Sequence, residues 1–155
     1  MNKSRGNNNY LGYLAFVLHA HLPYVRKNET NSLEEDWLFQ AILECYIPLL
    51  KVLEDSSRKD PENTKLTLSL SPTLITLLQN TQLQNKFPNW IKTRIQFVNS
   101  FKENESSSFL LKSLKDQLNY WEECSGNLIP KFNDLCNSGC LDLMTCAATH
   151  GYLPI

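Results

Sequence analysis

Three histidines are the side chains of this sequence best suited to do chemistry, and two of them stand close together. His19 and His21 follow an apolar run from Leu14 to Leu18, and Pro23 comes two residues after His21. An apolar run without alternation is typical of a buried strand in a parallel sheet, and residues two apart on a strand point to the same side. The sequence therefore predicts two imidazoles at the carboxyl end of a buried strand, where α/β proteins place their active sites.

The third histidine follows a second apolar run of the same kind. Residues 140–148 are predicted to form a buried strand that runs into His150, with Pro154 shortly beyond it. The carboxyl ends of parallel strands meet at one edge of a sheet. We therefore expect His19, His21 and His150 to lie on the same rim.

Three converging imidazoles are compatible with two chemistries. They could bind a catalytic zinc ion, for which three protein ligands and one open position are usual, or act as neutral hydrogen-bonding groups in a polar substrate pocket. A role confined to strand-end turns is the structural alternative. No Asp or Glu accompanies the histidines at either strand end, and Asp142 lies at the wrong end of its strand. We therefore expect neither a metal nor a cofactor.

The elements that must position these histidines can be predicted from the apolar pattern. The sequence predicts three parallel strands, over residues 10–18, 66–70 and 140–148. A helix capped by Ser32 and kinked at Pro48 connects the first two strands. Several helices, with a break at Ser106 to Ser108, connect the second to the third. Connections of this length force parallel pairing, so the fold class is α/β.

Composition fits a single soluble domain of 155 residues with a net charge of −1. There is no basic patch and no apolar stretch of transmembrane length, so neither nucleic acid nor a membrane is an expected partner. Residues 1–9 are polar, are predicted to be a disordered lead-in, and lack the apolar core of a signal peptide. The five cysteines are an odd number, which favours reduced thiols and a cytoplasmic location.

Longer segments of the sequence resemble a known family. Residues 12–26, which contain the first two histidines, resemble the opening of glycoside hydrolase family 57, and in particular its α-1,4-glucan branching enzymes. The resemblance continues through the segments 37–42, 46–50, 66–74 and 143–154. It covers the chain from about Tyr10 onward and is weak in the middle helices. The two histidine segments correspond to the first and second of the family's five conserved regions.

The resemblance implies that residues 10–155 are the amino-terminal part of an incomplete (β/α)7 barrel. It also implies a retaining mechanism on α-glucans such as glycogen, amylose or starch, with a Glu nucleophile and an Asp acid/base. In a branching enzyme the acceptor is the 6-hydroxyl of another glucan instead of water.

The resemblance further implies roles for individual side chains. His19, His21 and His150 would line the donor subsite and hydrogen-bond to sugar hydroxyls. Trp37 and Tyr152 are candidates for stacking on a sugar ring. Trp37 stands in an apolar helical stripe, so packing in the core is the stronger interpretation for that residue.

The family's catalytic Glu and Asp belong to later conserved regions, and this sequence stops at Ile155 before either. We therefore expect no catalytic residue here, a chain that is inactive and poorly stable alone, and the missing carboxyl-terminal part of the barrel as a partner. Two alternatives remain: part of a metal-dependent hydrolase with a His-x-His site, or a non-catalytic glucan-binding module. The sequence also leaves branching and hydrolysis open.

Overall fold

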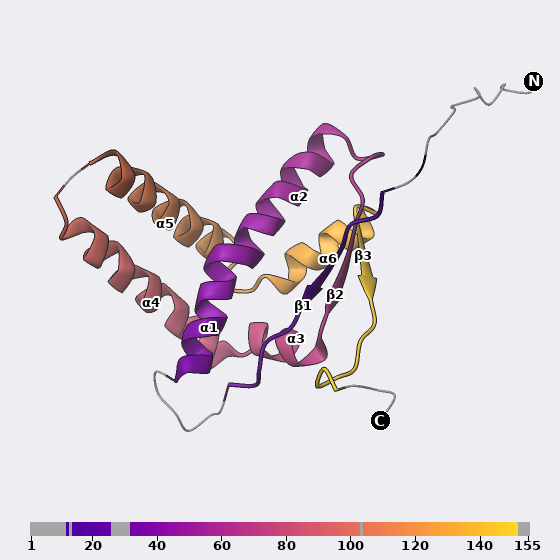
Figure 1. Cartoon of the computed structure of the whole chain (residues 1–155), viewed down its shortest axis with the longest axis horizontal. Helices are drawn as coiled ribbons and strands as arrows, with labels where there is room; N and C mark the ends of the chain where they lie inside the picture. The colour runs from indigo at the N-terminus through magenta and orange to yellow at the C-terminus, as the bar shows by residue number, and fades with distance from the viewer. Residues whose placement is uncertain (1–11, 13, 26–31, 103, 152–155) are drawn as a thin grey trace, which may run out of the picture.

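The computed structural model describes residue 12 and residues 14–25, 32–102 and 104–151. Within these ranges, three strands form one parallel sheet, β1 (Val17–Ala20), β2 (Leu66–Leu70) and β3 (Leu141–Met144), in the order β1-β2-β3. Helices pack against one face of this sheet and extend away from it as a hairpin (Figure 1). The predicted α/β class and parallel pairing are confirmed.

The helices occupy the two connections between the strands. Between β1 and β2 lie α1 (Leu33–Ala41), a π-helical turn η1 (Ile42–Tyr46) and α2 (Ile47–Lys59). Between β2 and β3 lie α3 (Pro72–Leu78), α4 (Thr81–Asn99), α5 (Glu105–Glu123) and α6 (Ile129–Asn137). Helices α4 and α5 lie side by side and form the hairpin (Figure 1). In the described residues, no helix is both long and apolar enough to cross a bilayer.

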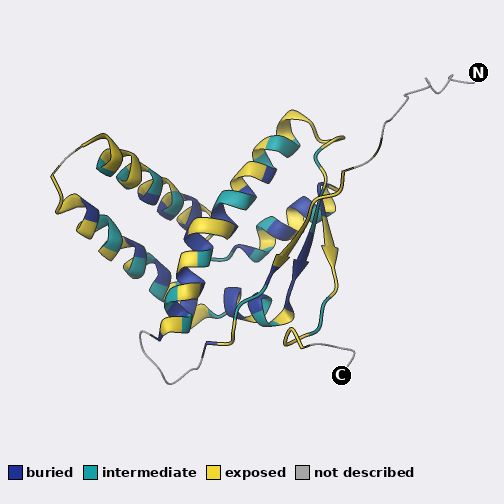
Figure 2. Ribbon diagram, in the orientation of Figure 1, coloured by how far each residue is buried: buried dark blue, intermediate teal, exposed yellow. Residues whose placement is uncertain are grey.

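Strand register decides which side chains face the helices. Leu18, Leu68 and Leu143 are aligned across the three strands, so their side chains share one face of the sheet. Leu68 on the central strand is 2% exposed, whereas Leu18 and Leu143 on the edge strands are 40% and 50% exposed. Figure 2 shows this contrast between the strands. Burial of the first and third strands on both faces was therefore a wrong prediction, because each has a strand on one side only within the described residues.

Two strand boundaries also differ from the prediction. The first strand was predicted over residues 10–18, but β1 spans Val17–Ala20, and residues 10, 11 and 13 lie outside the described ones. The third was predicted over residues 140–148, but β3 ends at Met144. His19 therefore lies within β1, and its backbone position is aligned with Ser69 of β2.

Two helix boundaries have local causes. Pro48 lacks an N–H and its ring would collide with a carbonyl one turn earlier. The chain accommodates it by widening into η1 directly before α2, where the N–H of Ile47 donates to the carbonyl of Ile42. The predicted break at Ser106 to Ser108 is wrong, because Asn104 caps α5 and Ser107 completes the capping box, which places these serines in the first turn.

Candidate functional site

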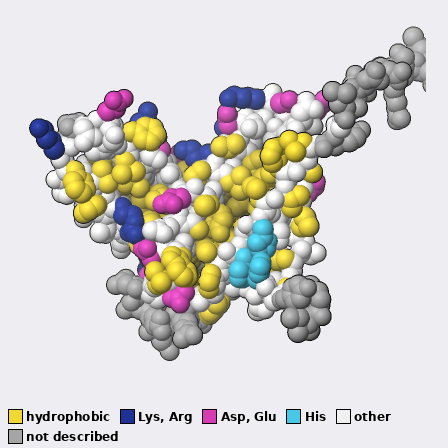
Figure 3. All heavy atoms as spheres, in the orientation of Figure 1, with side chains coloured by type: hydrophobic (Ala, Val, Ile, Leu, Met, Phe, Trp, Pro, Cys, Tyr) yellow, Lys and Arg dark blue, Asp and Glu magenta, His cyan; other side chains and the backbone are white. Residues whose placement is uncertain are grey.

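The carboxyl end of β1 and the turn that follows β3 bring the three histidines together. The ring centroids of His19 and His150 are 4.5 Å apart, as are those of His21 and His150, and those of His19 and His21 are 6.5 Å apart. His150 therefore lies between the other two. The histidines form one patch on the surface of the sheet end (Figure 3). The predicted convergence of the three imidazoles is confirmed.

A buried serine fixes the orientation of His21. Ser71 is fully buried directly after β2, and its Oγ lies 2.9 Å from Nδ1 of His21. The same Oγ accepts the N–H of Leu74 and so caps α3. The Ser71 hydroxyl proton can then be donated to Nδ1 of a neutral imidazole. In that tautomer, Nε2 of His21 carries the proton and can donate it to a ligand.

A tight turn presents His150. The N–H of His150 donates to the carbonyl of Ala147 at 3.0 Å. The backbone φ of His150 is +60°. This left-handed conformation is costly for residues other than glycine. The hydroxyl of Thr73, in the first turn of α3, donates to the carbonyl of Ala148 at 2.7 Å. Helix α3 therefore fixes two parts of the site: the turn that carries His150, through Thr73, and the ring of His21, through Ser71.

The electrostatics of the site favour the neutral imidazole of His21. Burial lowers the pKa of His21 below its ordinary value of 6.5, and repulsion from His150 and then from His19 lowers it further. A neutral imidazole donates one hydrogen bond and accepts another. This is the capacity needed to bind hydroxyl groups.

The described residues do not favour the metal alternative. Among them, no three His, Cys, Asp or Glu side chains are arranged to hold a metal ion. The residues that follow β1, β2 and β3 also include no carboxylate close to the histidines. The arrangement instead offers hydrogen-bonding side chains from three strand ends.

Trp37 and Tyr152, the two candidates for stacking on a sugar ring, are not shown to contact the three histidines. Trp37 is 43% exposed on α1 and does not pack in the core, so the core interpretation was wrong. The buried face of that helix carries Glu35, Leu38 and Phe39, and Trp37 projects from a different side. Tyr152 lies outside the described residues.

Ser71 and Thr73 are the polar side chains of the site that sequence reasoning missed. The signal was present, since a serine before a proline at a strand end is a common helix cap. The contact between Ser71 and His21 spans 50 positions of the chain, so it required knowledge of which strand neighbours β1.

The comparison with known families identifies this arrangement. Residues 15–155 match the model of glycosyl hydrolase family 57. The chain belongs to this family. The resemblance inferred from the histidine segments is therefore confirmed.

Curated relatives in family 57 include branching enzymes. The chain is 34% identical over 149 residues to the 1,4-alpha-glucan branching enzyme of Thermococcus kodakarensis, a match that covers 93% of this chain and 22% of that protein. It is 29% identical over 80 residues to a probable 1,4-alpha-glucan branching enzyme of Mycobacterium tuberculosis, covering 52% of this chain and 15% of that one.

Solved structures in the family share the fold. The branching enzyme of Pyrococcus horikoshii has a TM-score of 0.84 and 37% identity, with 92% of this chain and 28% of that chain covered. The alpha-amylase AmyC of Thermotoga maritima has a TM-score of 0.79 and 35% identity, with 90% and 28% covered. The three strands and their helices correspond to the amino-terminal portion of the (β/α)7 barrel of these enzymes.

The chain spans 22% of the length of the Thermococcus enzyme and 28% of the length of the Pyrococcus enzyme. The activity and substrates of those longer proteins are therefore treated for this chain as a proposal, which follows below.

Proposed function

We propose that this chain forms part of the donor subsite of a retaining α-glucan enzyme of the branching type. His19, His21 and His150 hydrogen-bond to hydroxyls of the donor glucan. The observation that carries the proposal is the contact of three imidazoles from two strand ends, with His150 within 4.5 Å of both others. The match to branching enzymes over nearly the whole chain supports an α-glucan such as glycogen, amylose or starch.

The proposal gives this chain substrate binding without covalent catalysis. A retaining mechanism needs a nucleophilic carboxylate and a second carboxyl group about 5–5.5 Å away. The segments that follow the three strands contain histidines, serines and threonines but no Asp or Glu close to the imidazoles. The catalytic Glu and Asp would come from the rest of a family 57 barrel, which is the partner that this proposal requires.

The experiment is calorimetric titration of the 155-residue chain with maltoheptaose. We expect saturable binding whose measured heat and stoichiometry fall when His19, His21 and His150 are replaced together by Ala, and stay unchanged when the exposed Thr149 is replaced by Ala. An incubation with amylose should give no new α-1,6 linkages. Binding unaffected by the triple substitution would overturn the role of the histidines. Branching by the chain alone would overturn the proposal that the catalytic carboxylates come from the rest of the barrel.

Hydrolysis is the second candidate reaction within the same proposal. This chain resembles the alpha-amylase of Thermotoga maritima about as closely as it resembles the branching enzyme of Pyrococcus horikoshii, in both TM-score and identity. The two reactions differ only in the acceptor, which is water or a glucan hydroxyl. Adding the carboxyl-terminal part of a branching enzyme barrel in trans should give branch linkages, whereas release of reducing sugar alone would favour hydrolysis.

We also propose a cytoplasmic location. All five cysteines are unpaired in the structure, and free thiols persist in a reducing compartment. Detection of the chain in the soluble cytoplasmic fraction of its cells would support this, and detection in a secreted fraction would contradict it.

A further inference from the structure

A groove lies between α1 and α4, and none of the three histidines lines it. It has a volume of about 720 Å³, within the range of small-molecule sites. Its lining comes from the start of α1 and the middle of α4, and no residue of the sheet or of its strand ends contributes to it. The groove is therefore separate from the proposed donor subsite.

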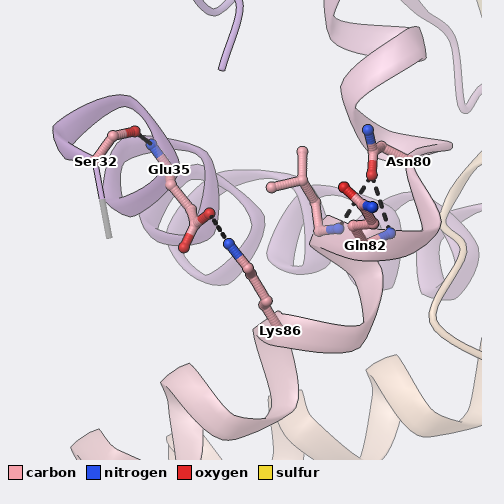
Figure 4. A network of polar contacts seen from close by, with 6 residues as sticks. Ser32, Glu35, Asn80, Gln82 and Lys86 are labelled. Atoms are coloured by element: carbon pink, nitrogen blue, oxygen red, sulfur yellow. Dashed lines mark hydrogen bonds and ion pairs between the residues drawn. The ribbon is translucent and has the colours of Figure 1, made fainter. Parts of the chain in front are cut away.

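A buried carboxylate in the groove has one oxygen without a donor. The Glu35 side chain is only 6% exposed, and one of its oxygens accepts a hydrogen bond from Nζ of Lys86 at 2.6 Å. Figure 4 shows Glu35 reaching from α1 toward Lys86 on α4. No donor to its other oxygen is found among the described residues. A buried carboxylate normally accepts several hydrogen bonds, so this oxygen can accept a donor from a ligand.

A second carboxylate extends the same polar wall. One oxygen of Asp36 accepts both the indole N–H of Trp90, at 2.7 Å, and a guanidinium N–H of Arg94, at 2.8 Å. Asn89 and Thr93 line the groove beside them from α4. The Asn89 side chain makes no hydrogen bond to another described residue, so its amide can donate and accept.

Charge indicates the class of ligand. Lys86 neutralises Glu35, and Arg94 neutralises Asp36. The groove therefore has no excess charge with which to attract an anion or a cation. It offers paired donors and acceptors beside the exposed apolar side chain of Leu33 and the Trp90 indole, on which the Arg94 guanidinium stacks at 3.2 Å from the ring centre. A sugar presents the same combination, with hydroxyls that both donate and accept around an apolar ring face.

We propose that the groove between α1 and α4 is a second carbohydrate-binding site, which holds a segment of an α-glucan outside the donor subsite. Glu35 and Asp36 accept hydroxyl hydrogens, and Asn89 and Lys86 donate to hydroxyl oxygens. The choice of an α-glucan rests on the proposed function, whereas the location of the site does not. A second site of this kind would keep a long glucan attached to the protein while its end is in the donor subsite.

The test follows the indole N–H signals of the isotopically labelled chain during titration with maltoheptaose. The Trp90 indole contacts Asp36, so its signal should move and saturate. Glu35→Gln, which replaces the acceptor facing the ligand by an amide donor, and Asn89→Ala, which removes the amide, should each weaken this binding by about tenfold. Asn85→Ala is the matched control, since Asn85 is exposed on α4 outside the groove. It should leave the affinity unchanged.

The histidine variant separates this proposal from the proposed function. With His19, His21 and His150 replaced by Ala, the Trp90 signal should still move with the same affinity. A Trp90 signal that does not move, or that is equally affected by Asn89→Ala and Asn85→Ala, would overturn the second site without affecting the histidines. A saturable Trp90 response together with unaltered binding in the histidine variant by calorimetry would instead overturn only the donor subsite.

Discussion

The properties of His21 follow from its neighbours and not from its own type. Ser71 binds its Nδ1, His150 packs against its ring at a centroid distance of 4.5 Å, and partial burial removes part of its hydration. Burial and the two other histidines all lower its pKa. A neutral imidazole at physiological pH suits a site that binds uncharged hydroxyls, since a doubly protonated ring could only donate.

We expect the His21 imidazole to titrate below pH 6.5, and replacement of His150 by Ala to raise its midpoint by removing the repulsion. Because the pKa is lower in the folded state, the unfolded chain binds more protons as pH falls through 6.5. The neutral His21 therefore contributes fully to the free energy of unfolding above pH 6.5. This contribution is lost as the pH falls from 6.5 to the pKa of His21 in the folded state. Imidazole signals in a pH titration by NMR measure the midpoint. Thr149→Ala should not move it, and a midpoint above 6.5 would contradict the prediction.

The backbone at His150 is held in a conformation that favours other residues. Its φ of +60° suits Gly or Asn, and a histidine there costs up to about 1–2 kcal/mol. We expect His150→Asn to leave the free energy of unfolding unchanged or raise it by up to about 1 kcal/mol, and His150→Val to lower it. Both should lose affinity for maltoheptaose. Urea denaturation measures the first effect, and His150→Asn being as destabilising as His150→Val would contradict the role of φ.

At the scale of elements, the short helix α3 connects the ends of all three strands. Its capping serine binds His21 after β1, its own N-terminus follows β2, and its Thr73 binds the carbonyl of Ala148 after β3. The N–H of Ser71 also donates to the carbonyl of Ala20 at 3.1 Å. One turn of helix therefore sets the relative positions of the three imidazoles.

We expect Ser71→Ala to lower the free energy of unfolding by about 1 kcal/mol, which is typical for loss of a helix cap. It should also release Nδ1 of His21 and alter the ratio of the two imidazole tautomers. Ser71→Thr keeps the hydroxyl and should largely restore both properties. Denaturant titration and ¹⁵N shifts of the imidazole measure the two effects. Identical tautomer ratios in Ser71→Ala and the unchanged chain would show that the serine acts only as a cap.

At the scale of the whole molecule, the sheet presents apolar side chains to solvent. Phe16, directly before β1, and Val17, Leu143 and Met144 on the two edge strands are between 48% and 60% exposed; the edge strands carry exposed positions in Figure 2. Exposed apolar edges of a sheet pair readily with other chains. In the relatives, which are about four times as long as the matched portion, the barrel continues beyond these strands.

We expect the purified 155-residue chain to self-associate through these edges. Replacing Phe16 and Leu143 together by Lys should shift it toward the monomer, because charges on edge strands oppose pairing. Val52→Lys is the control, since Val52 is 62% exposed on α2 and away from the sheet. Sedimentation velocity measures the distribution of species. A monomeric unchanged chain, or an equal effect of Val52→Lys, would contradict this prediction.

Local patterns were sufficient to predict much of the fold. The pattern of residues 66–70 predicted β2 to the residue, and Ser32 predicted a helix start. Patterns failed where a distant partner decided the outcome. Trp37 stands in a regular apolar stripe, yet it is 43% exposed, because α1 turns Leu38 and Phe39 toward α4 and the core.

The sequence by itself determined the family, the α/β class and the placement of three histidines at strand ends, since these depend on residue types and short spacings. The tertiary structure alone decided that His150 lies between His19 and His21, that Ser71 orients His21, and that Glu35 meets Lys86 in a groove. Each of these contacts joins residues 50 or more positions apart. Such contacts depend on which elements become neighbours when the apolar faces are buried, and no local pattern encodes that choice.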